Sequence, residues 1–172
     1  PLESGQKHYR EILSGVLFRI AASSFFQVNI LQAERIVELV LQSLQLSGSE
    51  TVVDAYAGVG TFAALLSPHA SKVIAIEESA SAISDANENL EQYHNVVIRQ
   101  GKTESILSEF KESVDALVLD PPRTGCQKHA LESLIHLAPK RIAYVSCDPA
   151  TLARDLRILV DGPYQLEKVQ PV

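Results

Sequence analysis

Methionine is absent from the 172 residues, the chain begins with Pro1, and cysteine occurs only twice. Because a complete gene product starts with methionine, we expect the sequence to be a piece of a longer protein. Cys126 and Cys147 form neither a C-x-x-C metal motif nor a disulfide framework, which is typical of the reducing cytoplasm. No apolar run approaches the ~18 residues that a membrane helix needs, and no signal-peptide pattern opens the chain. The sequence therefore predicts a cytoplasmic location without a membrane partner.

Positive charge is scarce as well. The 15 lysines and arginines are outnumbered by 21 acidic residues, which gives a formal net charge of −6. This balance argues against a broad basic face that grips nucleic acid, so a polynucleotide would be held mostly by other parts of the parent chain. With 46% apolar and 21% charged residues, the composition is that of a globular protein with a real core. We expect one compact monomer.

A metal-ligand pattern is also missing. The histidines are scattered without the spacing of a metal site, and we interpret them as surface or packing residues. No metal is predicted. The histidines are His8, His69, His94, His129 and His136.

From residue 51 onward, strand-like and helix-like patterns alternate with almost no filler. The predicted strands are 51–55, 73–77, 96–99, 114–119, 141–146 and 164–169. The predicted helices are 61–67, 79–91, 103–110, 127–137 and 150–160, preceded by an amphipathic helix at 30–46. Ahead of that helix, a strand-like run at 16–20 predicts a short β element that leads into a loop. Such alternation implies βαβ units and a doubly wound, mainly parallel α/β sheet.

A glycine-rich turn follows the first buried strand pattern, which ends at Asp54. Gly58 and Gly60 allow the backbone to approach a ligand closely. Glu77, at the end of the next strand, can accept both hydroxyls of a ribose. Position 63 is alanine, so the G-x-G-x-x-G of a dinucleotide site is not met, and this departure favours S-adenosylmethionine over NAD. The alternative is a tight turn that needs glycine for structural reasons alone.

A second strand pattern ends in a carboxylate, Asp120, and continues as Pro121, Pro122 and Arg123. The two prolines stiffen this loop. Asp120 and Arg123 are therefore expected at the same edge of the sheet as the glycine turn. A merely structural D-P-P turn is the alternative.

The run 141–145 has the pattern of a strand buried on both faces, and it stops just before Cys147. Asp148 can cap, and Pro149 can begin, a helix that continues to Gly162. Cys147 would then lie beside the positive end of a helix, at the edge where such sheets bind ligands and where thiolates are favoured. The alternative is a small buried apolar residue, which is how most free cysteines behave.

Four segments together resemble the RNA uracil-C5 methyltransferases, which make 5-methyluridine in transfer or ribosomal RNA. The segments are 25–29, 54–61, 120–123 and 145–149. They follow one another in the order and with the spacing of the family, and the resemblance as a whole extends from about residue 9 to residue 172. The resemblance implies a Rossmann-like domain of the class I S-adenosylmethionine-dependent methyltransferases at 30–172, truncated at its C-terminus, with 1–29 leading into it. It implies S-adenosylmethionine as cofactor and transfer or ribosomal RNA as partner.

The family pattern also implies roles for individual residues. Cys147 is the implied nucleophile, because thiolate addition to C6 of uracil creates an enolate whose C5 can attack the sulfonium methyl. A base then removes the C5 proton, and the uridine has to be flipped out or presented from a loop. Asp120 and Arg123 are expected to bind the base, with Arg123 stabilising O4. The implied cofactor-binding residues are Gln27, Asp54, Tyr56, Gly58, Gly60, Thr61, Glu77 and Asp120.

Two departures from the family pattern affect the expected activity. Lys102 stands where members carry an acidic or amide residue near the adenine, and Glu104 is the candidate replacement. The family's general-base glutamate falls just beyond Val172, and its N-terminal RNA-binding β-barrel is not included. We therefore expect this piece to bind S-adenosylmethionine and to turn over weakly or not at all.

Three other functions compete with this hypothesis. Amino-group methyltransferases carry an aromatic residue where Arg123 stands. RNA cytosine-C5 methyltransferases carry a second cysteine in the proline loop, but Cys126 lies three residues beyond Arg123, and we interpret it as a packing residue. The third alternative is a non-catalytic module that binds S-adenosylmethionine or RNA. Cys147 argues against that module, because binding alone needs no thiol there.

Overall fold

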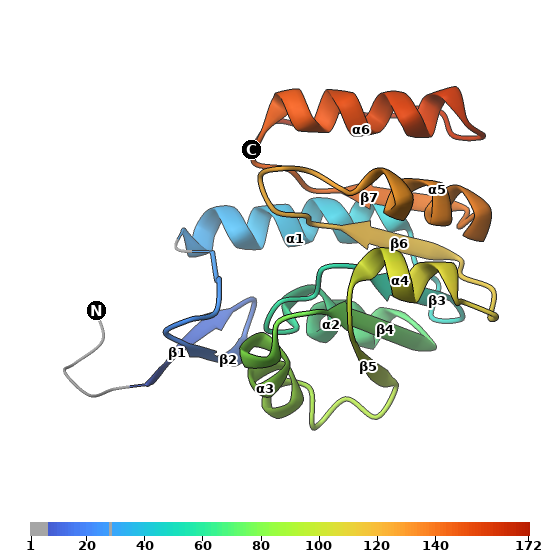
Figure 1. Cartoon of the computed structure of the whole chain (residues 1–172). Helices are drawn as coiled ribbons and strands as arrows, with labels where there is room; N and C mark the ends of the chain where they lie inside the picture. The colour runs from blue at the N-terminus through green and yellow to red at the C-terminus, as the bar shows by residue number, and fades with distance from the viewer. Residues whose placement is uncertain (1–6, 28) are drawn as a thin grey trace.

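The computed structural model describes residues 7–27 and 29–172, and a parallel sheet forms its centre (Figure 1). The strand order is β5-β4-β3-β6-β7, and each neighbouring pair is parallel. The strands are β3 (Thr51–Asp54), β4 (Lys72–Glu77), β5 (Val96–Gln100), β6 (Ala116–Leu119) and β7 (Arg141–Tyr144). The chain winds outward from β3 in one direction and then in the other, which confirms the predicted doubly wound α/β fold.

Helices cover both faces of this sheet, at the predicted places to within a few residues. One core cluster joins α1, α2 and α3 to one face, and a second joins α4, α5 and α6 to the other. The helices are α1 (Ile30–Leu44), α2 (Thr61–Leu66), the short η1 (Ser67–His69), α3 (Ala80–Asn89), α4 (Thr103–Ser108), α5 (Lys128–Leu137) and α6 (Pro149–Asp161). Among the described residues, no helix is both long and apolar enough to cross a membrane.

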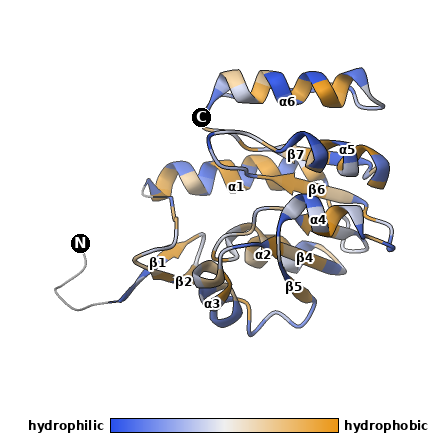
Figure 2. Ribbon diagram, in the orientation of Figure 1, coloured by the Kyte–Doolittle hydropathy of each residue, from blue (hydrophilic) through white to orange (hydrophobic). Residues whose placement is uncertain are grey.

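The two faces of the sheet carry side chains of different size. On the side of α1 and α2, the strands contribute small residues such as Ala75, Ala116 and Val118. On the opposite side they contribute larger ones such as Ile74 and Leu117. Since successive side chains of a strand point to opposite faces, strands covered on both sides are apolar throughout. Figure 2 shows these hydrophobic strands between helices that have one polar face. This packing fixes the register of the strands and hence the position of their ends.

An antiparallel hairpin precedes the sheet and lies beside α3 (Figure 1). Its strands are β1 (His8–Leu13) and β2 (Val16–Ala21). The predicted β element at 16–20 is therefore confirmed. Leu13, Phe18 and Ile20 are fully buried and belong to the same core cluster as one face of the sheet. The division of the chain at residue 29 into a leading element and a catalytic domain stays a prediction.

The strand predicted at 164–169 is wrong. Residues 164–172 have no regular secondary structure, and Leu166 and Val169 are exposed. Tyr164 N–H donates to Leu159 C=O at the end of α6 and not to the edge of the sheet. A strand forms only where a neighbour supplies backbone hydrogen bonds. The alternating pattern of this segment carries no information about such a neighbour.

Candidate functional site

The predicted site residues that follow β3, β4, β6 and β7 lie at the carboxyl edge of the sheet. β3 is in parallel register with β4 and with β6 at Asp54. Continuing this register past the strand ends places Tyr56, Glu77 and Asp120 level with one another. On the far side of β6, the first residue after β7 donates its N–H to Leu119 C=O at 2.7 Å. The turn that contains Cys147 therefore starts directly beside Asp120.

Glu77 is held in place by the backbone of the glycine turn. Its Oε2 accepts a hydrogen bond from Gly58 N–H at 2.9 Å, and its Oε1 accepts one from Ser79 N–H at 2.7 Å. Ala57 N–H in turn donates to Ile76 C=O at 2.8 Å. Each carboxylate oxygen has two lone pairs, so both oxygens of this half-buried side chain can accept one more hydrogen bond. The geometry suits a pair of vicinal hydroxyls.

Asp54 is fully buried, and one of its oxygens has no partner. Oδ2 accepts from Ala63 N–H at 2.9 Å, while Oδ1 has no hydrogen bond. Burial, followed by repulsion from Asp120 and Glu77, raises the pKa of Asp54 to about 7. Burial also raises the pKa of Asp120 to about 6. Among the described residues, no ion pair involves Asp54, Glu77 or Asp120. Three such carboxyl groups favour a ligand that brings positive charge.

The two glycines of the turn have different reasons to be glycine. Both have positive φ, 55° at Gly58 and 90° at Gly60. A Cβ at Gly60 would lie 2.8 Å from the Leu90 side chain, whereas a Cβ at Gly58 would meet nothing within 4 Å. Gly60 is therefore required for packing against the residue after α3. At Gly58 only the positive φ favours glycine, because a side chain would point into open space.

Tyr56 closes the site toward α4. The side chain is half-buried, and burial together with the nearby thiol of Cys126 raises the pKa of its hydroxyl. The carboxylate of Glu104 is close enough to contribute to the same shift. Lys102, the departure from the family pattern, is exposed at the position that precedes α4. The replacement role of Glu104 stays a prediction.

Thr61 and Gln27 are half-buried residues at the start of α2 and in the loop after the hairpin. Gln27 follows Phe26, which is buried with its ring centroid 5.8 Å from that of Phe18. This ring contact anchors the loop to the hairpin. The contacts of Gln27 and Thr61 with a cofactor stay predictions.

Cys147 is exposed, so the alternative that it is a buried packing residue is wrong. The predicted cap next to it is confirmed, because Asp148 Oδ1 accepts from Ala150 N–H at 3.0 Å and from Thr151 N–H at 2.9 Å. Asp148 N–H also donates to Ser146 Oγ at 3.1 Å. These bonds close a short turn between β7 and α6. The thiol is presented at the outside of this turn.

Arg123 lies in the proline loop, close to that same turn. Its side chain is exposed, and its backbone C=O accepts a hydrogen bond from Thr151 Oγ1 at 3.1 Å. The pKa of Asp148 is lowered by its cap bonds, first that from Thr151 N–H, and also by the charge of Arg123. The structure thus brings a cation and a thiol to the same side of the carboxyl edge.

A buried aspartate beneath this region was not predicted. Asp155 is fully buried, and its Oδ2 accepts from Tyr144 Oη at 2.6 Å and from Cys126 N–H at 2.7 Å. Cys126 is buried as predicted, and burial is the main cause that raises the pKa of its thiol to about 11. The available signal was an acidic residue within the apolar stripe of α6, between Leu152 and Leu159.

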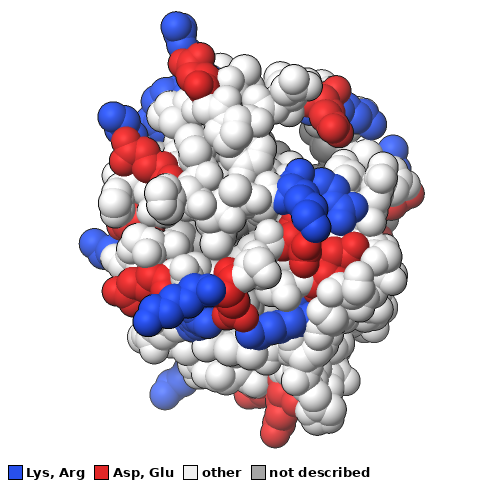
Figure 3. Space-filling model, turned by 90° about the vertical axis from the view of Figure 1, so that its right-hand side faces the viewer, with Lys and Arg blue, Asp and Glu red and all other residues white. Residues whose placement is uncertain are grey.

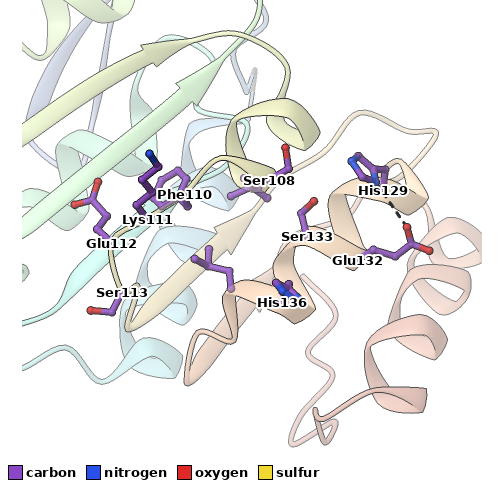
Figure 4. A pocket seen from close by; sticks show the side chains of 11 residues that line it. Ser108, Phe110, Lys111, Glu112, Ser113, His129, Glu132, Ser133 and His136 are labelled. Carbon is purple, nitrogen blue, oxygen red and sulfur yellow. Dashed lines mark ion pairs between the residues drawn. The ribbon is translucent and has the colours of Figure 1, made fainter.

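A surface hollow of about 540 Å³ lies elsewhere, between α4 and α5 (Figure 4). Its polar lining includes His129, Glu132, Ser133 and His136, and His129 pairs with Glu132 at 3.7 Å. None of the residues predicted for the cofactor or the substrate lines it. Within the described part of the chain, no group of three His, Cys, Asp or Glu side chains is arranged to hold a metal ion.

On the face shown in Figure 3, the charged side chains form no large patch of one sign. Lysines and arginines alternate there with aspartates and glutamates. This distribution agrees with the net charge of −6. Strong electrostatic attraction of a polyanion needs a concentration of positive charge, which this face does not offer.

Comparison with known sequences assigns the chain to a family. The profile described as Conserved hypothetical protein 95 matches residues 29–160. The chain belongs to this family. The match begins at the residue that caps α1 and ends within α6, so the Conserved hypothetical protein 95 region includes the sheet, the glycine turn and Cys147.

Several curated relatives of this Conserved hypothetical protein 95 member are named uncharacterized RNA methyltransferases. One from Listeria monocytogenes is 42% identical over 173 residues, which cover 98% of this chain and 38% of the relative. One from Gloeobacter violaceus is 41% identical over 171 residues, which cover 98% of this chain and 37% of the relative. The chain thus spans less than two fifths of the length of these relatives.

Solved structures place the fold among the S-adenosylmethionine-dependent methyltransferases. The Pyrococcus abyssi tRNA (uracil-54, C5)-methyltransferase, in complex with S-adenosyl-L-homocysteine, aligns with a TM-score of 0.74 at 32% identity. The alignment covers 90% of this chain and 38% of that one. Methanocaldococcus jannaschii TYW2, in complex with AdoMet, aligns with a TM-score of 0.62 at 20% identity over 80% of this chain and 61% of that one. The latter likeness concerns the fold alone.

Proposed function

We propose that this chain is the catalytic part of an S-adenosylmethionine-dependent RNA methyltransferase that acts on C5 of uracil through a covalent cysteine adduct. The observation that carries the proposal is the exposed thiol of Cys147, in a turn that starts beside Asp120 at the same edge as the glycine turn. Binding of a cofactor alone would need no thiol at this place. The resemblance in four segments and the Pyrococcus abyssi neighbour support the same reaction.

The carboxylates of the site fit S-adenosylmethionine. Glu77 has free lone pairs for the ribose hydroxyls, and the open side of Gly58 leaves room for the nucleoside. Asp54, with its unpartnered Oδ1, and Asp120 supply negative charge for the ammonium and sulfonium groups. When bound, the cofactor supplies an electrophilic methyl group.

The residues of the thiol side would carry the remaining steps. The thiolate of Cys147 adds to C6 of the uracil, and the ring's electron pair moves toward O4 to give an enolate. Arg123, which lies on this side of the edge, stabilises the developing charge on O4. C5 would then take the methyl group, with S-adenosyl-L-homocysteine as the leaving group. A base would remove the C5 proton, and the C6–S bond would break to release the thiolate. RNA binding falls mainly to other parts of the parent protein.

A short RNA that contains 5-fluorouridine tests this proposal without requiring the final base. Fluorine replaces the proton at C5, so the adduct cannot be resolved after methyl transfer. With S-adenosylmethionine present, we expect a complex that survives denaturing electrophoresis and whose mass equals protein, RNA and one methyl group. The absence of such a complex from a chain that binds both the cofactor and the RNA would contradict uracil-C5 chemistry.

Cytosine-C5 methylation is the second candidate, because it uses a cysteine in the same way. The buried thiol of Cys126, with its pKa raised to about 11, is unsuited to act as the second cysteine of the RNA-directed enzymes. A parallel assay with 5-fluorocytidine in the same RNA separates the two candidates. Adduct formation with 5-fluorouridine alone is the expected result.

A further inference from the structure

Two polar side chains are buried on the inner side of α3, outside the site described above. Asp85 is 0% exposed and Asn89 is 6% exposed. Polar groups buried this deeply need hydrogen-bond partners. Their partners lie in two other segments, the hairpin and the glycine turn. The proposed reaction uses neither residue.

Asp85 fixes the chain that leads to Gln27. Its Oδ1 accepts from the Arg19 guanidinium at 2.5 Å. Its Oδ2 accepts from Ala21 N–H at 2.8 Å and from Ser24 Oγ at 2.8 Å. These donors belong to the end of β2 and to the turn that follows it. A buried, charge-assisted anchor therefore sets where the loop with Gln27 begins.

Asn89 joins the hairpin to the glycine turn with one amide group. Its Oδ1 accepts from Arg19 N–H at 2.8 Å, and its Nδ2 donates to Arg19 C=O at 3.0 Å. The same Nδ2 donates to Val59 C=O at 2.9 Å, between the two glycines of the turn. The next residue, Leu90, occupies the space that Gly60 leaves free. Asn89 thus pairs with β2 as a neighbouring strand would and still holds the turn.

We propose that Asp85 and Asn89 are positioning residues that set the cofactor site without touching the cofactor. α3 begins three residues after Glu77, so this helix connects the ribose carboxylate, the glycine turn and the loop of Gln27. Preorganisation of this kind improves affinity because the ligand need not order the turn itself. The inference deepens the proposed function, on which it rests, since it takes S-adenosylmethionine as the ligand.

Calorimetric titration with S-adenosyl-L-homocysteine and amide hydrogen exchange together test this inference. In Asn89→Ala, we expect about tenfold weaker binding, because loss of one buried amide network loosens the turn. The amides of Val59 and Gly60 should exchange faster in the free protein, while those of β3 and β6 stay protected. Asn89→Asp is the second variant. It keeps the acceptor for Arg19 N–H and removes both donors, so it should show the same two changes.

Asn87→Ala is the matched control, since Asn87 is an exposed asparagine of the same helix. It should leave both readouts unchanged. Asp85→Asn should weaken binding and speed exchange in the 21–24 segment, with the glycine turn less affected. Unchanged affinity in both Asn89 variants would overturn the inference, whatever the exchange at Gly60.

The two measurements also separate this inference from the proposed function. A wild-type chain that fails to bind S-adenosyl-L-homocysteine would overturn the proposed function and, with it, the claim that the two residues position a cofactor. Binding by the wild-type chain with full affinity in both Asn89 variants would overturn the positioning role alone. The exchange data distinguish a loosened turn from global unfolding, which would expose the amides of β3 as well.

Discussion

At the cofactor half of the carboxyl edge, formed by the ends of β3 and β4, Asp54 accepts a hydrogen bond from the backbone of α2, and Glu77 accepts hydrogen bonds from the glycine turn and from the N-cap residue of α3. At the thiol half, formed by the ends of β6 and β7, the side chains of Cys147 and Arg123 are exposed. The first half therefore has its shape before a ligand arrives. The second half presents reactive groups that a substrate has to cover.

Beneath the surface, the two halves are supported in the same way. Asp85 and Asn89 anchor the cofactor half, and Asp155 anchors the thiol half by accepting from Tyr144 and Cys126. The difference between the halves is thus confined to the groups that meet ligands. It follows that substitution of Cys147 should leave cofactor binding unaffected, and that substitution of Glu77 should leave the thiol unaffected. Asp120 lies between the two halves and is expected to serve both.

Cys147→Ala should have the largest effect, and it should abolish adduct formation without changing cofactor binding. We expect adduct formation with 5-fluorouridine RNA to fall by at least about a thousandfold, because the other thiol, that of Cys126, is buried. Affinity for S-adenosyl-L-homocysteine, measured by calorimetry, should stay unchanged. Cys126→Ala serves as the control and should keep adduct formation, since the Cys126 thiol is buried. Loss of the adduct in Cys126→Ala alone would reverse the roles of the two cysteines.

Glu77→Ala should do the reverse: it should weaken cofactor binding without changing the reactivity of the Cys147 thiol. Loss of the two charge-assisted hydrogen bonds that we propose between Glu77 and the ribose would weaken S-adenosyl-L-homocysteine binding by about a hundredfold. The rate at which iodoacetamide modifies Cys147 should not change, because the thiol half does not depend on this carboxylate. Glu78→Ala is the neighbouring control, as Glu78 is exposed. Equal weakening by both variants would show that general charge, and not the ribose contact, was measured.

The sequence was sufficient for the features that local rules determine. The cap by Asp148 and the turn at Gly58 and Gly60 follow from short-range chemistry, and the structure contains both. The roles of Asp85 and Asn89 were not predicted because their partner Arg19 lies far away in the sequence. Polar residues in a helical pattern also normally indicate a face exposed to solvent. The prediction of a strand at 164–169 is wrong for the same reason, because strand pairing depends on a neighbour that is distant in the sequence.

A pair of glycine substitutions should sharpen the comparison within the cofactor half. Gly60→Ala should lower the free energy of unfolding by about 3 kcal/mol, because the new Cβ meets Leu90 and φ is positive. Gly58→Ala has only the backbone cost, about 1 kcal/mol. Urea denaturation measures both values. Equal losses would mean that Leu90 moves aside, and the packing role of Gly60 would then be wrong.

The pH dependence of cofactor binding should give the smallest effect, about tenfold between about pH 8 and about pH 5.5. The pKa of Asp54 is raised to about 7 by burial and then by Asp120 and Glu77, and that of Asp120 is raised to about 6 by burial. As the pH falls through these values, both groups become neutral and lose their attraction for the sulfonium. S-adenosyl-L-homocysteine lacks that charge, so its affinity should change less. Calorimetry with the two ligands measures the difference, and a parallel decline would contradict it.

The contribution of Asp54 to the stability of the fold should increase as the pH falls, whereas cofactor binding should weaken. This difference separates a charge effect on binding from acid unfolding. A carboxyl group whose pKa is raised on folding binds more protons in the folded state, so its contribution to stability decreases as the pH rises from about 4 to about 7. Asp54→Asn removes this penalty and keeps the acceptor for Ala63 N–H. Its melting temperature should therefore exceed that of the wild type by more at pH 8 than at pH 5.5. If the gain were the same at both values, Asp54 would titrate outside this range, and the pH dependence of binding would need another source.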